Sequence, residues 1–471
     1  MVRHLATGIV AAFAVASPVL AQETTDNPFS QHIEIEEGLV VVDVVEFATI
    51  PDSDGLAARM MLMVDEPGSQ RMFVNDMRGP IHTVSYDGQE VALYVDIDDP
   101  RWGVGVEDSG RERGFQSFAF HPEFAVEGSP GYGRFYTFSD IQDNEPQADF
   151  RPGGGDNTHH TVLLEWVAQD AQAPAYDGEG PRELMRFEQP FGNHNAGHLA
   201  FNPDAAPGHA DYGLLYIGSA DGGSGGDPLN LSQDPASAFG KILRIDPLGS
   251  DSENGQYGIP PHNPFVGPEH SDVLNEIYAI GMRNPQRFGW DPENGNLFMA
   301  DIGQNIVEKV SLVPYGSNLG WNDWEGSWGY ISRTEVRLDD PRSDPEITYP
   351  VVEYHRSDPI MHNRVAVTGI RVFRDAVLPQ LQDRVVFADF VSGEILHFDA
   401  DDLPEGGNDG IRRILLRDGG EEKTFLQLIQ EKNEEQGGEV AERTDIRFAD
   451  GPNGELFLLN KHDGTIRQLV P

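Results

Sequence analysis

A histidine and a carboxylate are spaced so that a β-hairpin would bring them together. His194 lies in an Asn-His-Asn cluster, and Asp221 begins a glycine-rich turn later in the chain. Between them, two apolar runs flank an Asn-Pro-Asp turn, which predicts two antiparallel strands. Pairing Phe201 with Leu214 sets His194 opposite Asp221 at the open end of the hairpin. The carboxylate would orient the imidazole, which could then act as a general base.

The elements that would position this pair are repeated along the chain. A strand, a proline-containing turn and a strand rich in Phe, Tyr, Leu and Val recur six times. The turns lie at 66–68, 121–123, 202–204, 291–293, 378–380 and 451–454. Because no unit can bury both faces of its own sheet, the repeats predict an all-β fold, a six-bladed β-propeller forming one domain over 36–471. Residues 39–42 are expected to complete the C-terminal blade, and 421–432 to form a short helix.

Several charged side chains stand where predicted strands of different repeats begin. In the fourth repeat, pairing Trp290 with Asn296 sets Arg283 opposite Gly303. The residues at the start of other strands are Glu112, Arg364, Arg443 and Arg447. Propeller symmetry would gather them on one rim, where a cluster of arginines favours an anionic ligand. A plain turn at 283–285 and ordinary surface ion pairs are the structural alternatives.

Composition limits the classes of partner. The chain of 471 residues has 33 basic and 78 acidic residues, a net charge of -45. Such a surface argues against binding nucleic acid or an anionic membrane. The chain has no cysteine, so disulfides and thiolate metal ligands are excluded.

The N-terminus has the layout of a secretory signal. Residues 1–21 combine a short basic start, an apolar stretch and a small residue before Gln22, which predicts a cleavable signal peptide. Residues 22–35 would be an N-terminal extension. No later stretch has the roughly 18 apolar residues that a membrane-spanning helix needs, so we expect no membrane insertion and a periplasmic or secreted protein.

An ordered series of motifs resembles one known family. The matching segments are 114–124, 193–201, 221–223, 240–246, 259–265, 281–285, 301–305, 318–321, 325–326 and 389–393. They are similar to the soluble sugar dehydrogenases that depend on pyrroloquinoline quinone (PQQ), the glucose/sorbosone dehydrogenase family of six-bladed propellers. The resemblance covers most of the chain from about residue 72 to residue 469.

The resemblance implies a set of roles. His194 would remove the proton of a sugar's anomeric hydroxyl while hydride passes to the quinone, and Asp221 would hold the imidazole. Arg283 would stabilise charge on the quinone oxygen, with Asn284 as a neighbouring ligand. The carbonyls of Gly303 and Gln304 would hold Ca²⁺, which also binds the quinone. Glu112 falls near the cofactor, and Arg443 and Arg447 near the arginines that clamp its carboxylates.

Some positions depart from the family pattern. Val391 stands where some members have a lysine, and Arg364 is the residue expected to compensate for the missing charge. His198 replaces a common arginine. These changes bear on the affinity for PQQ and on the substrate more than on the fold.

Two other classes of function remain open from the sequence. A calcium-dependent lactonase would use Asp, Glu and Asn side chains around an axial metal and would have no need of the arginines. A non-catalytic propeller that binds a carbohydrate or a protein would have lost the cofactor, as the missing lysine permits. The leading hypothesis is an oxidoreductase acting on an aldose or polyol, with PQQ and Ca²⁺ as cofactors; the sugar and the electron acceptor cannot be named.

Overall fold

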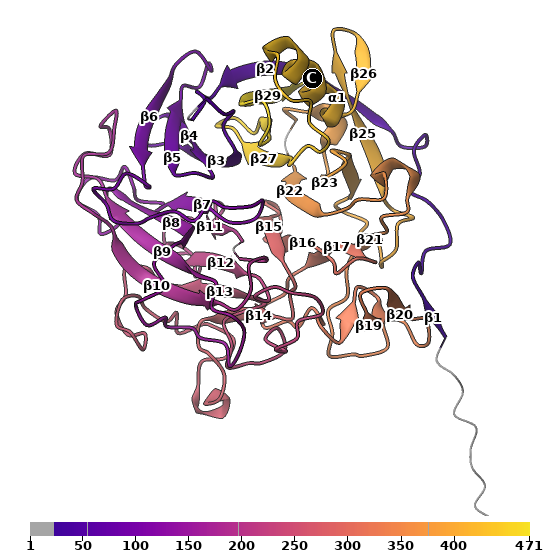
Figure 1. Cartoon of the computed structure of the whole chain (residues 1–471), viewed down its shortest axis with the longest axis horizontal. Helices are drawn as coiled ribbons and strands as arrows, with labels where there is room; N and C mark the ends of the chain where they lie inside the picture. Colours follow the sequence, from indigo (N-terminus) through magenta and orange to yellow (C-terminus); the bar gives the residue numbers. More distant parts are fainter. Residues whose placement is uncertain (1–22, 54, 196, 375) are drawn as a thin grey trace, which may run out of the picture.

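The strands follow one another along the chain in antiparallel sheets (Figure 1). The computed structural model describes residues 23–53, 55–195, 197–374 and 376–471, so the predicted signal peptide at 1–21 lies outside the described residues. Strands such as β7 are buried along their whole length because neighbouring sheets pack face to face. Aromatic side chains fill these interfaces: the rings of Phe73 and Phe120, from successive sheets, are 4.5 Å apart.

Four sheets of four strands each take up the first three quarters of the chain. The first contains β3 (Met60–Glu66), β4 (Arg71–Asp76), β5 (Pro80–Val84) and β6 (Val91–Asp96), and the second β7 (Phe115–Phe120), β8 (Arg134–Ile141), β9 (His159–Val167) and β10 (Arg182–Gln189). The third contains β11 (Leu199–Phe201), β12 (Leu215–Ser219), β13 (Lys241–Ile245) and β14 (Ile277–Ile280), and the fourth β15 (Pro285–Trp290), β16 (Leu297–Asp301), β17 (Glu308–Leu312) and β21 (Val352–Tyr354).

The last part of the chain forms a sheet of nine strands with the N-terminal strand inside it. Its strands are β22 (Val367–Phe373), β23 (Arg384–Asp389), β24 (Ile395–Asp399), β25 (Arg412–Asp418), β26 (Glu421–Lys423), β2 (Val40–Thr49), β29 (Thr465–Val470), β28 (Leu456–Leu459) and β27 (Arg447–Asp450). Strand β2 pairs antiparallel with β29, which confirms that this segment completes the C-terminal sheet. It also pairs in parallel with β25, and so joins two four-stranded halves.

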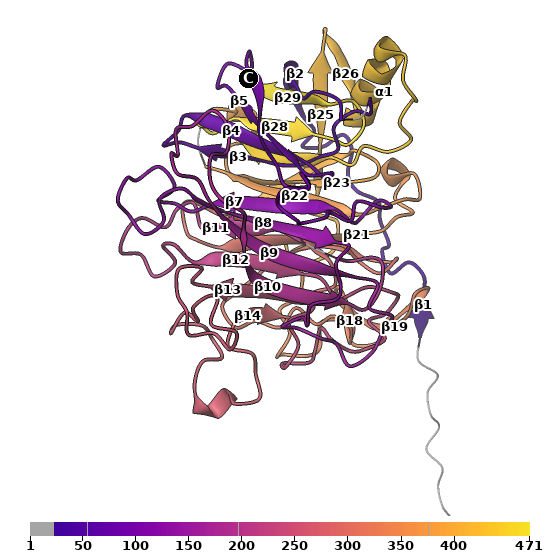
Figure 2. The same ribbon diagram turned by 60° about the vertical axis from the view of Figure 1, so that its left-hand side comes forward.

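Smaller elements lie at the periphery. Strands β1 (Thr24–Thr25), β20 (Glu335–Arg337), β19 (Trp328–Ser332) and β18 (Trp324–Glu325) form a small sheet at the edge of the molecule in both views (Figures 1 and 2). Short 3₁₀ turns span Pro268–His270, Pro359–Met361 and Pro379–Leu381. Helix α1 spans Phe425–Gln436 and begins with a capping box at Thr424. It starts later than the predicted 421–432 because β26 pairs with β25.

The first strands of successive sheets surround the centre of the molecule (Figure 1). Strand β3 contacts β7 and β27, β7 contacts β11, β12 contacts β15, and β22 contacts both β15 and β27. These contacts close a circuit, so residues on strands far apart in sequence face a common region. We call the region inside β3, β7, β11, β15, β22 and β27 the axial region.

The hairpin that positions His194 differs from the prediction by one residue. Phe201 pairs with Leu215, and not with Leu214. Leu214 belongs to the turn because its N–H donates to the carbonyl of Asp211 at 3.1 Å. Both arms of the hairpin still end at the same rim. Within the part of the chain that the structure describes, no helix is both long and apolar enough to cross a bilayer.

Candidate functional site

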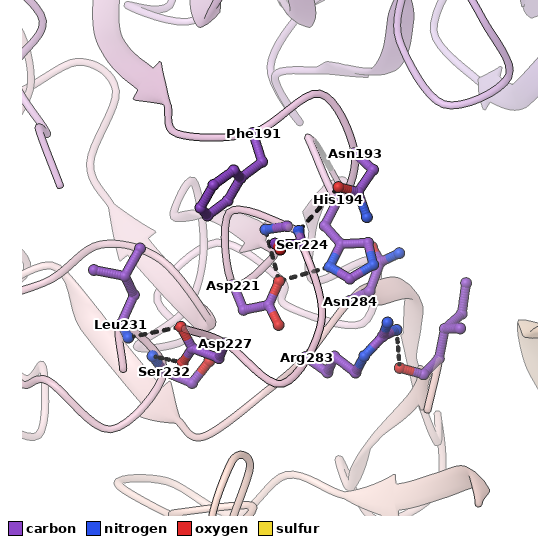
Figure 3. Close-up of polar contacts among 12 residues, drawn as sticks. Phe191, Asn193, His194, Asp221, Ser224, Asp227, Leu231, Ser232, Arg283 and Asn284 are labelled. Atoms are coloured by element: carbon purple, nitrogen blue, oxygen red, sulfur yellow. Dashed lines mark hydrogen bonds and ion pairs between the residues drawn. The ribbon is translucent and has the colours of Figure 1, made fainter. Parts of the chain in front are cut away.

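His194 and Asp221 form a hydrogen-bonded pair at the open end of the β11–β12 hairpin (Figure 3). Nδ1 of His194 lies 2.6 Å from Oδ1 of Asp221, and both side chains are buried. The predicted proximity of the two groups is therefore confirmed. An ionised carboxylate can only accept, so Nδ1 carries the hydrogen and Nε2 keeps its lone pair. Among the described residues, no group bonds Nε2, which leaves it free to accept a proton.

The Asp221 carboxylate is held from two further directions. Oδ1 also accepts from the N–H of Gly223 at 2.9 Å, and Oδ2 accepts from Nε1 of Trp321 at 3.0 Å. Burial acts to raise the pKa of this carboxyl, but His194 and then Arg283 outweigh burial and hold the pKa below its usual value. Asp221 is therefore a carboxylate at neutral pH, with a fixed orientation toward the imidazole.

Local backbone geometry brings the two loops of this pair into contact. His194 has a left-handed backbone with φ of 56°, and its N–H donates to Oε2 of Glu112 at 2.8 Å. Gly223 has φ of 101°, and a Cβ there would lie 2.3 Å from the carbonyl oxygen of Asn193. Only glycine fits that contact. Non-glycine residues in this conformation are uncommon and cluster at functional sites.

Arg283 and Asn284 lie beside the pair (Figure 3). Their backbone N–H groups donate to the Asp301 carboxylate, at 3.2 and 2.7 Å. The Arg283 guanidinium is buried, donates to the carbonyl of Ile302 at 3.0 Å and packs 5.8 Å from the ring of Trp321. Its Nε has no partner among the described residues.

The register of this second hairpin also differs from the prediction. Trp290 pairs with Leu297 instead of Asn296, because the N–H of Asp291 donates to the carbonyl of Asn296 and closes the turn. At the rim, the residue paired with Asp301 is Pro285, with a bulge before the next pair. Arg283 is thus held by the Asp301 carboxylate and not set opposite Gly303 in a strand.

A tight turn at residues 303–307 wraps around the carboxylate of Glu325. Oε1 of Glu325 accepts the N–H groups of residues 304–307, at 2.9 to 3.1 Å. A Cβ at position 303 would lie 1.8 Å from the carbonyl of Val307, so only glycine fits there. No donor in the described ranges bonds the carbonyl oxygens of Gly303 or Gln304. These two oxygens have free lone pairs, the ligand type that Ca²⁺ prefers.

A cavity of about 870 Å³ is lined in part by the loop that leads to Glu112. Its lining includes Gly110 and Arg111, which directly precede Glu112, the partner of His194. The basic side chains in its lining are Arg59, Arg78, Arg111, Arg364, Arg443 and Lys461, and the acidic ones are Asp52, Glu439, Glu442 and Asp445. An excess of cations is notable in a chain with a net charge of -45. We call this the basic cavity.

Lys461 is one of the less neutralised of these cations. Its Nζ lies 3.2 Å from the sulfur of Met77 and 3.2 Å from the carbonyl of Arg111. Over the described residues it forms no ion pair with a carboxylate. Burial holds the pKa of this ammonium well below its usual value; Asp445 acts against burial, and three neighbouring arginines act with it. An anionic ligand in the cavity would restore the ammonium charge.

The three predicted cofactor arginines have different surroundings. Arg443 lines the basic cavity, pairs with Asp445 at 2.7 Å and packs 4.5 Å from the ring of Phe390. Arg447 is 1% exposed and lies 4.4 Å from the same ring. The side chain of Arg364 is 62% exposed and faces Glu442 at 3.8 Å. Solvent screens such a pair, so Arg364 contributes less to the cavity than the sequence indicated.

Two contributors were missed by reasoning from the sequence. Trp321 lies 100 residues from Asp221, and only the packing of the fold shows that its indole holds the carboxylate. Lys461 stands in a Lys-His-Asp-Gly turn, where a lysine is ordinarily a solvated surface residue. No local pattern distinguishes either residue. Among described residues, no group of three or more His, Cys, Asp and Glu side chains is arranged to hold a metal.

Comparison with curated proteins gives relatives of two kinds. The chain is 30% identical over 359 residues to the HIPL1 protein of Arabidopsis thaliana, covering 69% of this chain and 50% of that protein. It is 25% identical over 229 residues to quinoprotein glucose dehydrogenase B of Acinetobacter calcoaceticus, covering 47% of this chain and 42% of that protein. A third relative is human Hedgehog-interacting protein, 26% identical over 225 residues, 48% of this chain and 29% of that protein. The matches span about half or less of each relative.

Solved structures and a family model agree on the fold. The PQQ-bound aldose sugar dehydrogenase of Streptomyces coelicolor superposes with a TM-score of 0.56 at 20% identity, over 91% of this chain and 98% of that one. The apo-form of the soluble aldose sugar dehydrogenase of Escherichia coli superposes with a TM-score of 0.60 at 17% identity, over 91% of this chain and 99% of that one. The model for Glucose / Sorbosone dehydrogenase matches residues 61–466. The chain therefore belongs to the glucose/sorbosone dehydrogenase family.

Proposed function

We propose that this protein is an exported, PQQ-dependent dehydrogenase that oxidises an aldose or related polyol. The observation that carries the proposal is the oriented His194–Asp221 pair, with its free Nε2, whose partner Glu112 directly follows two residues that line a cation-rich cavity. Proton removal from a sugar beside an anionic cofactor requires both a base and a set of cations. Membership of the family and the similarity to sugar dehydrogenases support the same conclusion.

The cations of the basic cavity fit the three carboxylates of PQQ. Arg443 and Lys461 face it, and Lys461 has no carboxylate of its own. Burial depresses the pKa of Lys461, and the neighbouring arginines act in the same direction. We propose that Lys461, more than the exposed Arg364, makes up for the lysine that Val391 replaces. Glu112, Asn284, Arg443 and Arg447 complete the proposed cofactor surroundings.

The turn at 303–307 fits a calcium ion. The carbonyl oxygens of Gly303 and Gln304 have no donor among described residues, and the Glu325 carboxylate fixes the turn from behind through four N–H groups. Carbonyl oxygens are hard ligands suited to Ca²⁺. We propose these two carbonyls as the protein's ligands, with PQQ completing the coordination.

PQQ, when bound with Ca²⁺, supplies the hydride acceptor. The protein's own groups supply proton transfer and orientation. Nε2 of His194 takes the proton of the anomeric hydroxyl, and Asp221 stabilises the imidazolium that forms, because its carboxylate faces Nδ1 at 2.6 Å. Trp321 keeps Asp221 in that orientation. Arg283 would contribute a buried positive charge beside the pair, to stabilise the negative charge that develops there.

The proposed scaffold is a propeller of six blades. Four sheets of four strands supply four blades, and the nine-stranded sheet divides at β2 into two more. The closed circuit of contacts among the first strands of these sheets supports this division. We propose the predicted signal peptide, residues 1–21, as the means of export to the periplasm or medium.

The experiment that tests this proposal is reconstitution. Purified protein is mixed with PQQ and CaCl₂, and reduction of a redox dye is followed with a panel of neutral aldoses. We expect reduction that depends on PQQ, on calcium and on the sugar together. Dye reduction that persists without PQQ, or its absence with every aldose while PQQ is bound, would contradict the proposal.

A non-catalytic role is the second candidate, favoured by one observation. The HIPL1 and Hedgehog-interacting proteins cover as much of this chain as, or more than, the quinoprotein dehydrogenase does. In that case the same propeller would present a binding surface for a carbohydrate or a protein without using a cofactor. Thermal unfolding distinguishes the candidates: PQQ with Ca²⁺ should raise Tm if the cofactor site is intact and leave it unchanged if it is not.

A further inference from the structure

Two buried arginines of the axial region form no ion pair among the described residues. Arg287 lies on β15, and its guanidinium reaches the carbonyl of Met61 on β3 at 2.6 Å. Strands β15 and β3 belong to sheets that are not neighbours in the circuit, so the side chain crosses the axial region. Arg447 lies on β27, the strand beside β3. The two side chains are 4% and 1% exposed.

Both guanidinium groups bond only to neutral partners. Arg287 donates to the carbonyls of Met61 and Gln286, and Arg447 to the carbonyl of Ile446. In the described ranges, neither forms an ion pair, and Nε of each is without a partner. The sequence pattern did not single out Arg287, whereas it placed Arg447 at the start of a strand, and the resemblance placed Arg447 near the cofactor.

Some other arginines with little exposure do have carboxylates. Arg244 pairs with Asp211 at 2.7 Å, and Arg374 pairs with Asp291 at 2.7 Å. The axial pair instead resembles Arg283, which is also buried and bonds a carbonyl. A guanidinium does not lose its proton in proteins, and a buried charge without a counter-charge is strongly unfavourable. The charge of Arg447 adds to burial in lowering the pKa of Arg287, which expresses the same repulsion.

A further donor lies near Arg287. His198, just before β11, is only partly buried, although it lies among the central strands. Its ring packs 4.6 Å from Phe288, and its Nδ1 accepts from the N–H of Phe288 at 3.4 Å. With Nδ1 accepting, Nε2 carries the hydrogen and is a donor. Burial holds the pKa of His198 well below its usual value, so the ring is neutral.

We propose that the axial region binds a small monovalent inorganic anion, of the halide class, between Arg287 and Arg447, with His198 as a neighbouring donor. The anion supplies the counter-charge that the protein lacks there. The site is distinct from that of the proposed cofactor, which would lie at the rim beside His194 and share Arg447. The anion has a structural role, because it neutralises buried positive charge from strands on opposite sides of the circuit.

The direct test is crystallographic. Crystals of the full chain are grown in a gluconate salt, soaked in NaBr, and measured at the bromine absorption edge. We expect an anomalous peak within hydrogen-bonding distance of the guanidinium groups of Arg287 and Arg447. Density at that point without anomalous signal would mean water only and would overturn the proposal. A bromide peak that disappears when PQQ and Ca²⁺ are added would overturn the claim of a separate site.

Thermal unfolding gives a second test that needs no crystal. At constant ionic strength, replacing gluconate by chloride should raise Tm of the wild-type protein in a saturating manner. Arg287→Met should abolish this chloride dependence. Arg244→Met is the matched control, since it removes an equally buried arginine that has a carboxylate, and it should keep the dependence. Equal chloride dependence in wild type and Arg287→Met would contradict the proposal, whatever the absolute stability of the variants.

Discussion

The His194–Asp221 pair and the basic cavity differ in how their charges are neutralised. Every polar atom of the Asp221 carboxylate has a partner inside the protein, supplied by His194, Gly223 and Trp321. In the basic cavity, Lys461 has only a sulfur and a carbonyl. One region is complete without a ligand, whereas the other has more cations than carboxylates.

This difference separates orientation from binding. A satisfied network keeps its geometry whether or not a ligand is present, which suits a base that must be poised before the substrate arrives. An unsatisfied set of cations gains most when an anion enters, which suits a cofactor that supplies three carboxylates. Substitutions in the first region should therefore change turnover, and substitutions in the second should change cofactor affinity.

The largest expected effect comes from Asp221→Asn. An amide in place of the carboxylate can donate to Nδ1, which would reverse the tautomer and place the hydrogen on Nε2. We expect kcat for sugar oxidation to fall by about 10³ to 10⁴ while the Kd for PQQ stays within twofold. Steady-state dye reduction and a PQQ titration measure the two quantities.

Asp227→Asn is the matched control for that substitution. Asp227 lies in the same glycine-rich segment and is as buried as Asp221, but it accepts from backbone groups of Leu231 and Ser232 (Figure 3). Its removal should not lower kcat comparably. A loss of kcat as large as that of Asp221→Asn would show that general disturbance of the loop, and not the tautomer, is responsible.

Trp321→Phe tests the outer part of the same network. The ring packing is retained, but Oδ2 of Asp221 loses its indole donor at 3.0 Å. We expect kcat to fall by roughly tenfold, which corresponds to about one hydrogen bond, with PQQ affinity unchanged. If PQQ affinity fell and kcat did not, the indole would belong to the cofactor site and the division between the two regions would be wrong.

Lys461→Met tests the basic cavity. The variant keeps the length of the side chain and removes its charge, so we expect the Kd for PQQ to rise by about tenfold with kcat at saturating PQQ nearly unchanged. Arg364→Gln, which removes an exposed cation from the same lining, should change Kd less than about twofold. Equal effects of both variants would mean that the cavity acts through its overall charge and not through Lys461.

The pH dependence of PQQ binding should give a smaller effect of known sign. The pKa of Lys461 is depressed in the free protein, so the ammonium loses its proton at lower pH than usual as the solution becomes alkaline. A carboxylate ligand favours the charged form, and binding therefore takes up a proton. We expect PQQ affinity to fall several-fold between neutral pH and pH of about 10. Lys461→Arg should remove most of this fall; an unchanged slope would exclude Lys461 as its source.

The sequence allowed the catalytic pair to be predicted because both partners lie on one hairpin. The predicted register was one residue off, yet His194 and Asp221 flank the strands on both sides, and the shift did not separate them. The all-β class and the closing role of the N-terminal strand β2 followed from repeats and were also confirmed. A local sequence pattern is sufficient to predict a contact that is made within one supersecondary unit.

Contacts between sheets could not be predicted in this way. Trp321, Lys461 and Arg287 reach their partners only through the circular arrangement, with sequence separations of 100 residues or more in each case. Their residue types are ordinary for a buried aromatic, a turn and a strand. Conversely, Arg364 looked suitable from its position but is mostly solvent-exposed. Whether such a side chain meets its partner depends on the angle between the sheets. No local spacing in the sequence encodes that angle.

The central claim is that His194 acts on substrate and not on cofactor binding, and one measurement tests it most directly. Wild-type protein and His194→Ala are titrated with PQQ in the presence of CaCl₂, and each complex is then mixed anaerobically with an aldose that the wild type oxidises while the absorbance of PQQ is followed. The account predicts a similar Kd for PQQ in both proteins and reduction of the bound PQQ in the wild type only. Reduction at the wild-type rate in His194→Ala, or loss of PQQ binding in that variant, would contradict it.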